Sequence, residues 1–195
     1  EGTFDCPELV RATWLPVYLG GVDSTKLTMP AGTSHTLPKG AQILVQLHLL
    51  NASADTIEDK AGVVFHTTKD ETLTKAGVFG FDNRDILIPA QSAAVEQTQA
   101  CPTVGKDMDV FAVFGHMHQH GKKIEVSRGE TVGKDVLYSA EWEFQDQPTV
   151  TTDFHIAKED TVNVRCWFDN PTDKDVTYGE SSYEEMCSFI LYYTP

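Results

Sequence analysis

Three histidines alternate with other residues in the segment His116-Met-His-Gln-His-Gly121, which directly follows an apolar stretch. In an extended strand alternate side chains share one face, so His116, His118 and His120 are expected to point the same way. Two imidazoles at positions i and i+2 can reach one metal ion, and they suit zinc, copper, nickel or iron about equally. The segment therefore predicts a histidine metal site, although a solvated strand or histidines packed in the core would give the same pattern.

A methionine in an acidic turn offers a ligand of another kind. Met186 lies in Gly179-Glu-Ser-Ser-Tyr-Glu-Glu-Met-Cys187, between a polar loop and the last apolar stretch of the chain. A thioether is a poor ligand for hard cations and a good one for Cu(I). A methionine packed in the core would look the same in the sequence. The residues alone therefore indicate a histidine site and leave its third ligand open.

The elements that must position these residues are short strands. Four stretches bounded by Gly, Pro, Asn and Asp are rich in β-branched and aromatic residues: 43–50, 110–114, 161–168 and 188–193. No window shows sustained helical periodicity. The pattern predicts an all-β chain that folds as an antiparallel β-sandwich or jelly roll. A polar, strand-poor stretch at 51–62 predicts a boundary, so that residues 63–195 form one sandwich domain.

The charge balance excludes one class of partner. The chain has 195 residues, with 29 acidic against 15 basic side chains and a formal net charge of −14. Nucleic-acid binding requires a basic face, and Lys122 and Lys123 are the only adjacent basic pair, so no nucleic-acid partner is expected. The longest apolar run, residues 43–50, is too short to span a bilayer, so no membrane partner is expected either.

The cysteines point to an oxidising compartment. Four of them stand at positions 6, 101, 166 and 187, and none belongs to a Cys-x-x-Cys pair, which argues against a zinc or thioredoxin-like motif. An even number without such a pair predicts two disulfides in a secreted, periplasmic or extracellular protein. Four buried free thiols are the alternative.

Taken together, three segments resemble the copper type II, ascorbate-dependent monooxygenases, the family of peptidylglycine α-hydroxylating monooxygenase and dopamine β-monooxygenase. These segments are Leu44-Val-Gln-Leu-His48, the stretch from Val110 to Gly121, and the stretch from Gly179 to Cys187. The resemblance extends from about Trp14 to Tyr193, nearly the whole chain. The flanking Trp142-Glu-Phe144 and Trp167-Phe-Asp-Asn-Pro171 are more similar to bacterial members than to animal ones.

This resemblance implies a β-sandwich of the peptidylglycine monooxygenase type that binds one copper ion, as Cu(I) or Cu(II). Its ligands would be His116, His118 and Met186, with His120 beside them or at the surface. His48 resembles the third histidine of the family's other, electron-donating copper. The adjacent histidine pair that completes that second site is missing from this chain, so His48 is either a remnant of it or an ordinary histidine.

The activity that the resemblance implies is that of an oxidoreductase. The chain would be the oxygen-activating half of a copper monooxygenase, which uses dioxygen and a small-molecule reductant such as ascorbate to hydroxylate a substrate C–H bond. Residues 1–62 would be the end of a first monooxygenase domain, so an upstream electron-donating copper domain is an expected partner. The missing histidine pair favours an alternative, a copper-binding or carrier module without monooxygenase activity.

The same comparison implies the disulfide pairing. Cys166 and Cys187 match a family pair that ties the strand before the acidic loop to the methionine-bearing turn. Cys101 matches a family cysteine whose usual partner lies beyond the point where this chain stops, and Cys6 is expected to pair with it.

Three positions depart from the peptide-processing members of the family. Phe114 stands where those enzymes have an arginine that holds the substrate carboxylate, and Ser188 and Ile190 stand where they have an asparagine and a tyrosine. A terminal carboxylate would meet an apolar face in place of a guanidinium group. A peptidylglycine substrate is therefore not expected.

Overall fold

A computed structural model describes residues 14–20, 26–47, 51, 53–58, 60, 62–102 and 105–195. The regular elements in these ranges are all strands: β1 (Thr33–Ser34), β2 (Thr74–Lys75), β3 (Gly77–Asp82), β4 (Leu87–Ile88), β5 (Ser92–Pro102), β6 (Met108–His116), β7 (Gly121–Arg128), β8 (Asp135–Glu141), β9 (Val150–Ile156), β10 (Thr161–Asn170), β11 (Val176–Thr177) and β12 (Ser188–Thr194). The all-β prediction is confirmed. Among the described residues no helix is long and apolar enough to cross a membrane.

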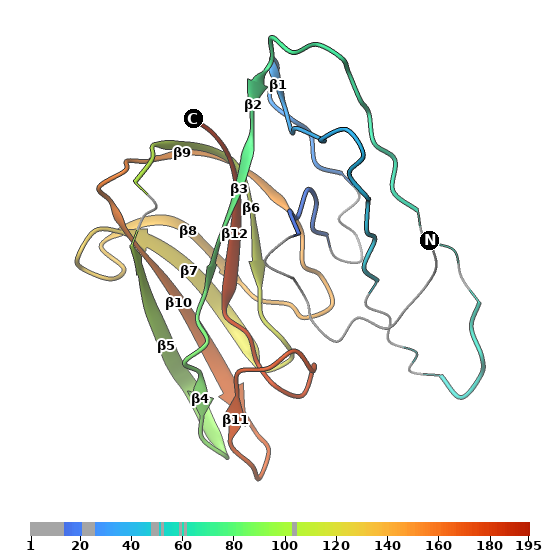
Figure 1. Cartoon of the computed structure of the whole chain (residues 1–195). Coiled ribbons are helices and arrows are strands. Elements are labelled where there is room, and N and C mark those ends of the chain that lie inside the picture. Colours follow the sequence, from blue (N-terminus) through green and yellow to red (C-terminus); the bar gives the residue numbers. More distant parts are fainter. Residues whose placement is uncertain are drawn as a thin grey trace.

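Two antiparallel sheets of four strands form the two layers of a sandwich (Figure 1). One, which we call the β6 sheet, has the strand order β3-β12-β6-β9. The other, which we call the β7 sheet, has the order β5-β10-β7-β8. The pairs β1-β2 and β11-β4 form two further small sheets. Three of the four stretches expected as strands lie in β6, β10 and β12, and the antiparallel sandwich is confirmed.

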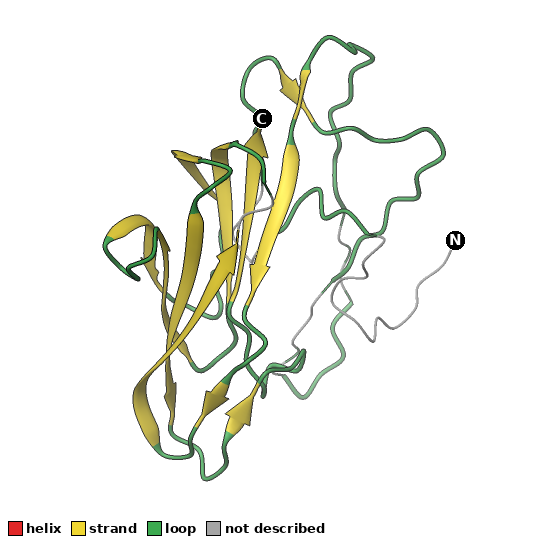
Figure 2. Ribbon diagram, turned by 60° about the vertical axis from the view of Figure 1, so that its left-hand side comes forward, coloured by secondary structure: helices red, strands yellow, loops and turns green. Residues whose placement is uncertain are grey.

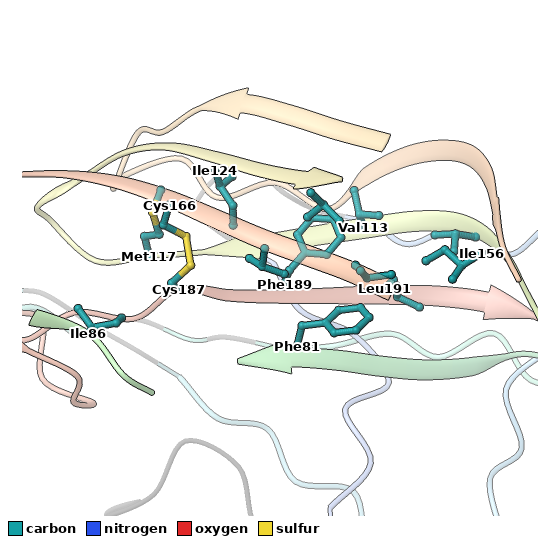
Figure 3. Close-up of a cluster of buried hydrophobic side chains, with 14 of the residues drawn as sticks. Phe81, Ile86, Val113, Met117, Ile124, Ile156, Cys166, Cys187, Phe189 and Leu191 are labelled. Carbon is teal, nitrogen blue, oxygen red and sulfur yellow. A yellow bond between two sulfur atoms is a disulfide. The ribbon is translucent and has the colours of Figure 1, made fainter. Parts of the chain in front are cut away.

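The core fills the space between the two sheets, and alternation along the strands produces it. On β12 every second side chain faces the β7 sheet, and Phe189 and Leu191 are fully buried there. On β6 a bulge between Val110 and Ala112 shifts the alternation by one residue, and Val113 beyond it is fully buried in the same core. Figure 3 shows these side chains packed with Ile124 of β7. A Cβ atom on Gly115 would lie 3.3 Å from the Ile124 side chain, so a glycine at this position lets the two layers approach closely.

An irregular part of the chain packs against the opposite, outer face of the β6 sheet. Tyr192 of β12 is fully buried although it faces away from the core, and its ring lies edge-on to that of His35, with the ring centroids 6.1 Å apart. The hydroxyl of Thr149 donates a hydrogen bond to the carbonyl oxygen of Leu19. Figure 2 shows the loops of this irregular part beside the sandwich. The outer face is therefore partly covered by residues that precede the sandwich.

The strand expected at residues 43–50 is wrong over the part that the structure describes. Residues 43–47 form no strand, and Ile43 and Leu47 are 55% and 53% exposed. An apolar composition favours a strand, but a strand also needs neighbours for its N–H and C=O groups. None of the strands in the described ranges pairs with this stretch. Residues 48–50 lie outside the described part of the chain.

Candidate metal centre

His116 is the last residue of β6, and His118 lies in the loop that follows it. The strand ends at His116, and the rings of His116 and His118 lie edge-on, with centroids 5.1 Å apart and an interplanar angle of 83°. The alternation expected for all three histidines fails beyond this point, because residues 117–120 leave the strand and form a turn closed by a hydrogen bond from Gly121 N–H to the His118 carbonyl oxygen. His116 and His118 are thus brought together by a strand end and the loop that follows it.

Both imidazoles are held through their Nδ1 atoms. Nδ1 of His118 lies 3.0 Å from the carbonyl oxygen of Glu184, and Nδ1 of His116 lies 2.7 Å from Oε1 of Gln147. The amide nitrogen of Gln147 donates to the carbonyl oxygen of Phe144, and this bond fixes which side of the amide faces His116. Because both partners are acceptors, each ring carries a proton on Nδ1 and presents Nε2 as the nitrogen able to bind a metal.

Met186 is buried, with 2% of its surface exposed. Met108 and Met117 are members of the hydrophobic cluster between the sheets, and Met186 is not. It lies just before β12, whose first residue, Ser188, is the direct cross-strand partner of His116. Strand pairing therefore brings the methionine-bearing turn to the same end of the β6 sheet as the two histidines.

A buried carboxylate joins the histidine loop to the methionine turn. The side chain of Glu185 is fully buried and accepts hydrogen bonds from the backbone N–H groups of His118 (2.9 Å), His120 (2.6 Å) and Met186 (3.3 Å). Burial raises the pKa of Glu185 to about 7, and the three backbone hydrogen bonds act in the opposite direction. Sequence reasoning missed this residue; its only sequence signal is an acidic side chain directly before Met186.

The predicted disulfide between Cys166 and Cys187 is confirmed. Its two Cα atoms are 6.0 Å apart, and it links β10 of the β7 sheet to the residue that precedes β12 of the β6 sheet (Figure 3). Met186 is therefore bounded by a cross-linked residue on one side and by Glu185 on the other. The expected pair Cys6–Cys101 depends on Cys6, which lies outside the described residues.

The other two candidate histidines stand apart from this arrangement. His120 is 7% exposed, and its Nδ1 atom lies 3.2 Å from the carbonyl oxygen of Asp169. His120 lines an open depression together with Lys122 and Tyr183. His48 lies outside the described part of the chain.

The positions that depart from the peptide-processing enzymes surround His116. Phe114 is 6% exposed, and its ring stacks on His116 with an interplanar angle of 14° and centroids 6.1 Å apart. Ile190 pairs directly with Phe114, and the hydroxyl of Ser188 donates to Oδ1 of Asp82 at 2.7 Å. On the outer face, the cross-strand pair Phe114–Ile190 is therefore apolar, and the neighbouring pair His116–Ser188 is polar.

The donor set fits copper. Among the residues that the structure describes, no three His, Cys, Asp or Glu side chains come close enough together to hold a metal ion. The thioether of Met186 is a ligand of another type, and it favours Cu(I) over zinc and over hard cations. Two imidazoles that present Nε2, together with the buried thioether of the neighbouring turn, are donors that suit a soft, redox-active ion such as copper.

Comparison with known proteins also points to copper. Residues 74–195 match the domain described as copper type II ascorbate-dependent monooxygenase, C-terminal domain. Peptidyl-glycine alpha-amidating monooxygenase A of Xenopus laevis is 26% identical over 163 residues. That alignment covers 77% of this chain and 17% of the frog protein, so the chain spans a small part of that relative. The chain belongs to the copper type II ascorbate-dependent monooxygenase family and contains its C-terminal domain.

Proposed function

We propose that this chain binds one copper ion through His116, His118 and Met186 and is the oxygen-activating half of a copper monooxygenase. The observation that carries the proposal is the linkage at the end of the β6 sheet. Both imidazoles are held through Nδ1, and the backbone of Met186 is joined to that of His118 by a single carboxylate. Family membership supports the copper assignment independently of this geometry.

The residues of the site would hold the ion and shield it. When bound, copper supplies the electron-transfer chemistry by which dioxygen is reduced and a substrate C–H bond is oxidised. His118 and Met186 are 5% and 2% exposed, so bulk water has little access to these two side chains. Gln147 and the Glu184 carbonyl keep the protons of the two rings on Nδ1, away from the metal-binding nitrogens.

The proposed substrate is one that needs no carboxylate anchor at position 114. A phenyl ring stacked on His116 offers no charge to a terminal carboxylate, in contrast to the arginine of the peptide-processing enzymes. Dioxygen and a small-molecule reductant such as ascorbate are the proposed co-substrates. The second electron would come from an upstream copper domain, and residues 1–62 are proposed to be the end of that domain. Residues 63–195 are proposed to be the oxygen-activating domain that receives the electron.

The proposed location is outside the reducing cytoplasm, in a secreted, periplasmic or extracellular setting. The Cys166–Cys187 disulfide supports this, because disulfides that cross-link a fold persist in oxidising compartments.

The experiment that tests the proposal is an anaerobic Cu(I) titration, read by X-ray absorption. We expect one copper per chain with nitrogen and sulfur scatterers, and loss of the sulfur signal in Met186→Leu. Met117→Leu is the matched control, since Met117 lies between the two histidines in sequence but belongs to the core cluster. A sulfur signal that survives Met186→Leu would contradict the ligand assignment. Copper binding without ascorbate-dependent oxygen uptake, in the chain joined to its upstream domain, would favour a carrier module.

A further inference from the structure

The loop that holds His118 has no strand to satisfy its backbone. β6 ends at His116 and β7 begins at Gly121, so the N–H groups between them cannot join a sheet ladder. Buried N–H groups without acceptors are costly, and a folded chain normally supplies a partner for each. The partner here is a side chain from a segment more than sixty residues later in the chain.

Glu185 supplies that partner from a fully buried position. Its Oε1 atom accepts from His120 N–H at 2.6 Å, and its Oε2 atom accepts from His118 N–H at 2.9 Å and from Met186 N–H at 3.3 Å. Hydrogen bonds to a carboxylate are stronger than those between neutral groups. Both oxygens are thus used to fix two separate segments relative to each other.

Backbone and side-chain groups near Glu185 and His118 also help to fix the position of His118. The carbonyl oxygen of Glu184 accepts from Nδ1 of His118, so the main-chain position and the ring orientation of this histidine both depend on residues 184 and 185. The indole N–H of Trp142 donates to the carbonyl oxygen of His118 at 3.1 Å and fixes the loop from its other side. The position of His118 is therefore set by the residues directly before Met186.

We propose that Glu185 is the positioning residue of the metal centre, and that its carboxylate sets the distance between the imidazole of His118 and the thioether of Met186. This inference rests on the proposed copper site. It predicts that loss of the carboxylate weakens metal binding although every ligand is retained. Partners that orient metal ligands typically contribute about 10–100-fold to metal affinity.

The test compares Glu185→Gln with the wild type and with Asn163→Ala. The Glu185→Gln change keeps the shape of the side chain but turns one acceptor oxygen into an N–H₂ group that faces N–H donors. Asn163 is the matched control, because it is 2% exposed and its side chain also hydrogen-bonds the backbone, donating to the carbonyl oxygen of Gly129 just past the far end of β7. Cu(I) affinity is measured by competition with a chromophoric chelator, the sulfur scatterer by X-ray absorption, and stability by urea denaturation.

We expect Glu185→Gln to lower Cu(I) affinity by about 10–100-fold and to weaken the sulfur signal. Asn163→Ala should lower the denaturation midpoint and leave affinity unchanged. Wild-type affinity and an unchanged sulfur signal in Glu185→Gln would overturn this inference alone. A wild type that binds no Cu(I) would overturn the proposed function, and with it the ligands that Glu185 is said to position.

Amide hydrogen exchange of the metal-free wild type tests the inference even if Glu185→Gln does not fold. In the metal-free wild type, the amide protons of His118 and His120 share one buried acceptor group, so they should exchange with solvent at the same free energy of opening. Independent, fast exchange of the two amides would overturn the inference. Glu185→Asp, which retracts the carboxylate by one methylene, should speed both exchanges together.

Discussion

The two faces of the β6 sheet are built from the same strands and have different tasks. On the inner face, Phe189 and Leu191 are fully buried against the β7 sheet and contribute to the core. On the outer face, the alternate positions hold His116 and Ser188, next to the buried Phe114. Neighbouring residues of a strand point to opposite faces, so the same alternation that builds the core also places His116 on the outer face. The comparison teaches that stability and metal binding should be separable by substitution.

The largest expected effect on stability comes from the inner face. Phe189→Ala should lower the free energy of unfolding by about 3–5 kcal/mol, since a fully buried aromatic ring is removed from a packed core. Its neighbour Ile190, on the outer face, is only partly buried, and Ile190→Ala should cost roughly 1 kcal/mol. Urea denaturation of both variants measures the difference. Equal costs would show that the two faces do not differ as described.

The disulfide should have the next largest effect. Cys166 and Cys187 are separated by 21 residues, and a closed loop of this size stabilises a fold by about 3 kcal/mol. The double variant Cys166→Ala/Cys187→Ala should lose this amount in urea denaturation. Because the bond holds the residue next to Met186, the variant should also bind Cu(I) more weakly than its loss of stability alone explains. Unchanged affinity in the folded fraction would argue that Glu185 alone fixes the turn.

A substitution beside His116 on the outer face should change Cu(I) affinity more than it changes stability. Gln147→Leu removes the acceptor for Nδ1 of His116, and we expect Cu(I) affinity to fall by about tenfold, with a change in stability below about 1 kcal/mol. Chelator competition and urea denaturation measure the two quantities. Gln145→Leu is the control, because Gln145 is exposed and lies two residues away. A similar loss of affinity in both variants would contradict the role given to Gln147.

The smallest expected effect concerns the irregular part of the chain that packs on the outer face of the β6 sheet. Burial lowers the pKa of His35 from its ordinary value of 6.5. The folded state therefore binds the His35 proton less readily than the unfolded state does. This contribution to stability is complete above pH 6.5 and is lost as the pH falls below it.

Amide exchange at β1 and β2 measures this effect. The N–H groups of Thr74 and Ala76 donate to the carbonyl oxygens of Gly32 and Ser34, and their protection should fall as the pH drops below 6.5, the ordinary pKa of histidine. The fall should be larger in the wild type than in His35→Phe. The same pH dependence in both proteins would show that other groups are responsible.

The sequence was a good guide to the fold where alternation and burial coincide. β6, β10 and β12 were expected from their β-branched and aromatic residues, and in the structure these residues find partners on a facing sheet. Residues 43–47 have a similar composition, yet they form no strand in the structure, because composition reports the tendency to be buried and says nothing of which neighbour is present. Family resemblance identified the Cys166–Cys187 pair, which spacing alone left open.

The candidate centre was less accessible to sequence reasoning. The i, i+2 spacing suggested the His116–His118 pair, but the extension to His120 was wrong because the strand ends before it. The contacts that orient the rings come from Gln147 and from Glu184, which are 31 and 66 residues away in the chain. Such pairings follow from how distant segments meet after folding, so no local pattern of residues announces them.

Gly121, where β7 begins, has a consequence for how this loop can change in evolution. A Cβ atom there would lie 2.7 Å from the Trp142 ring and 2.9 Å from Cβ of Met117, so any larger residue would push the loop away from its anchors. Gln119, two positions earlier, is exposed and has room to vary. Substitutions should therefore be tolerated at position 119 and selected against at position 121, although neither residue is proposed as a ligand.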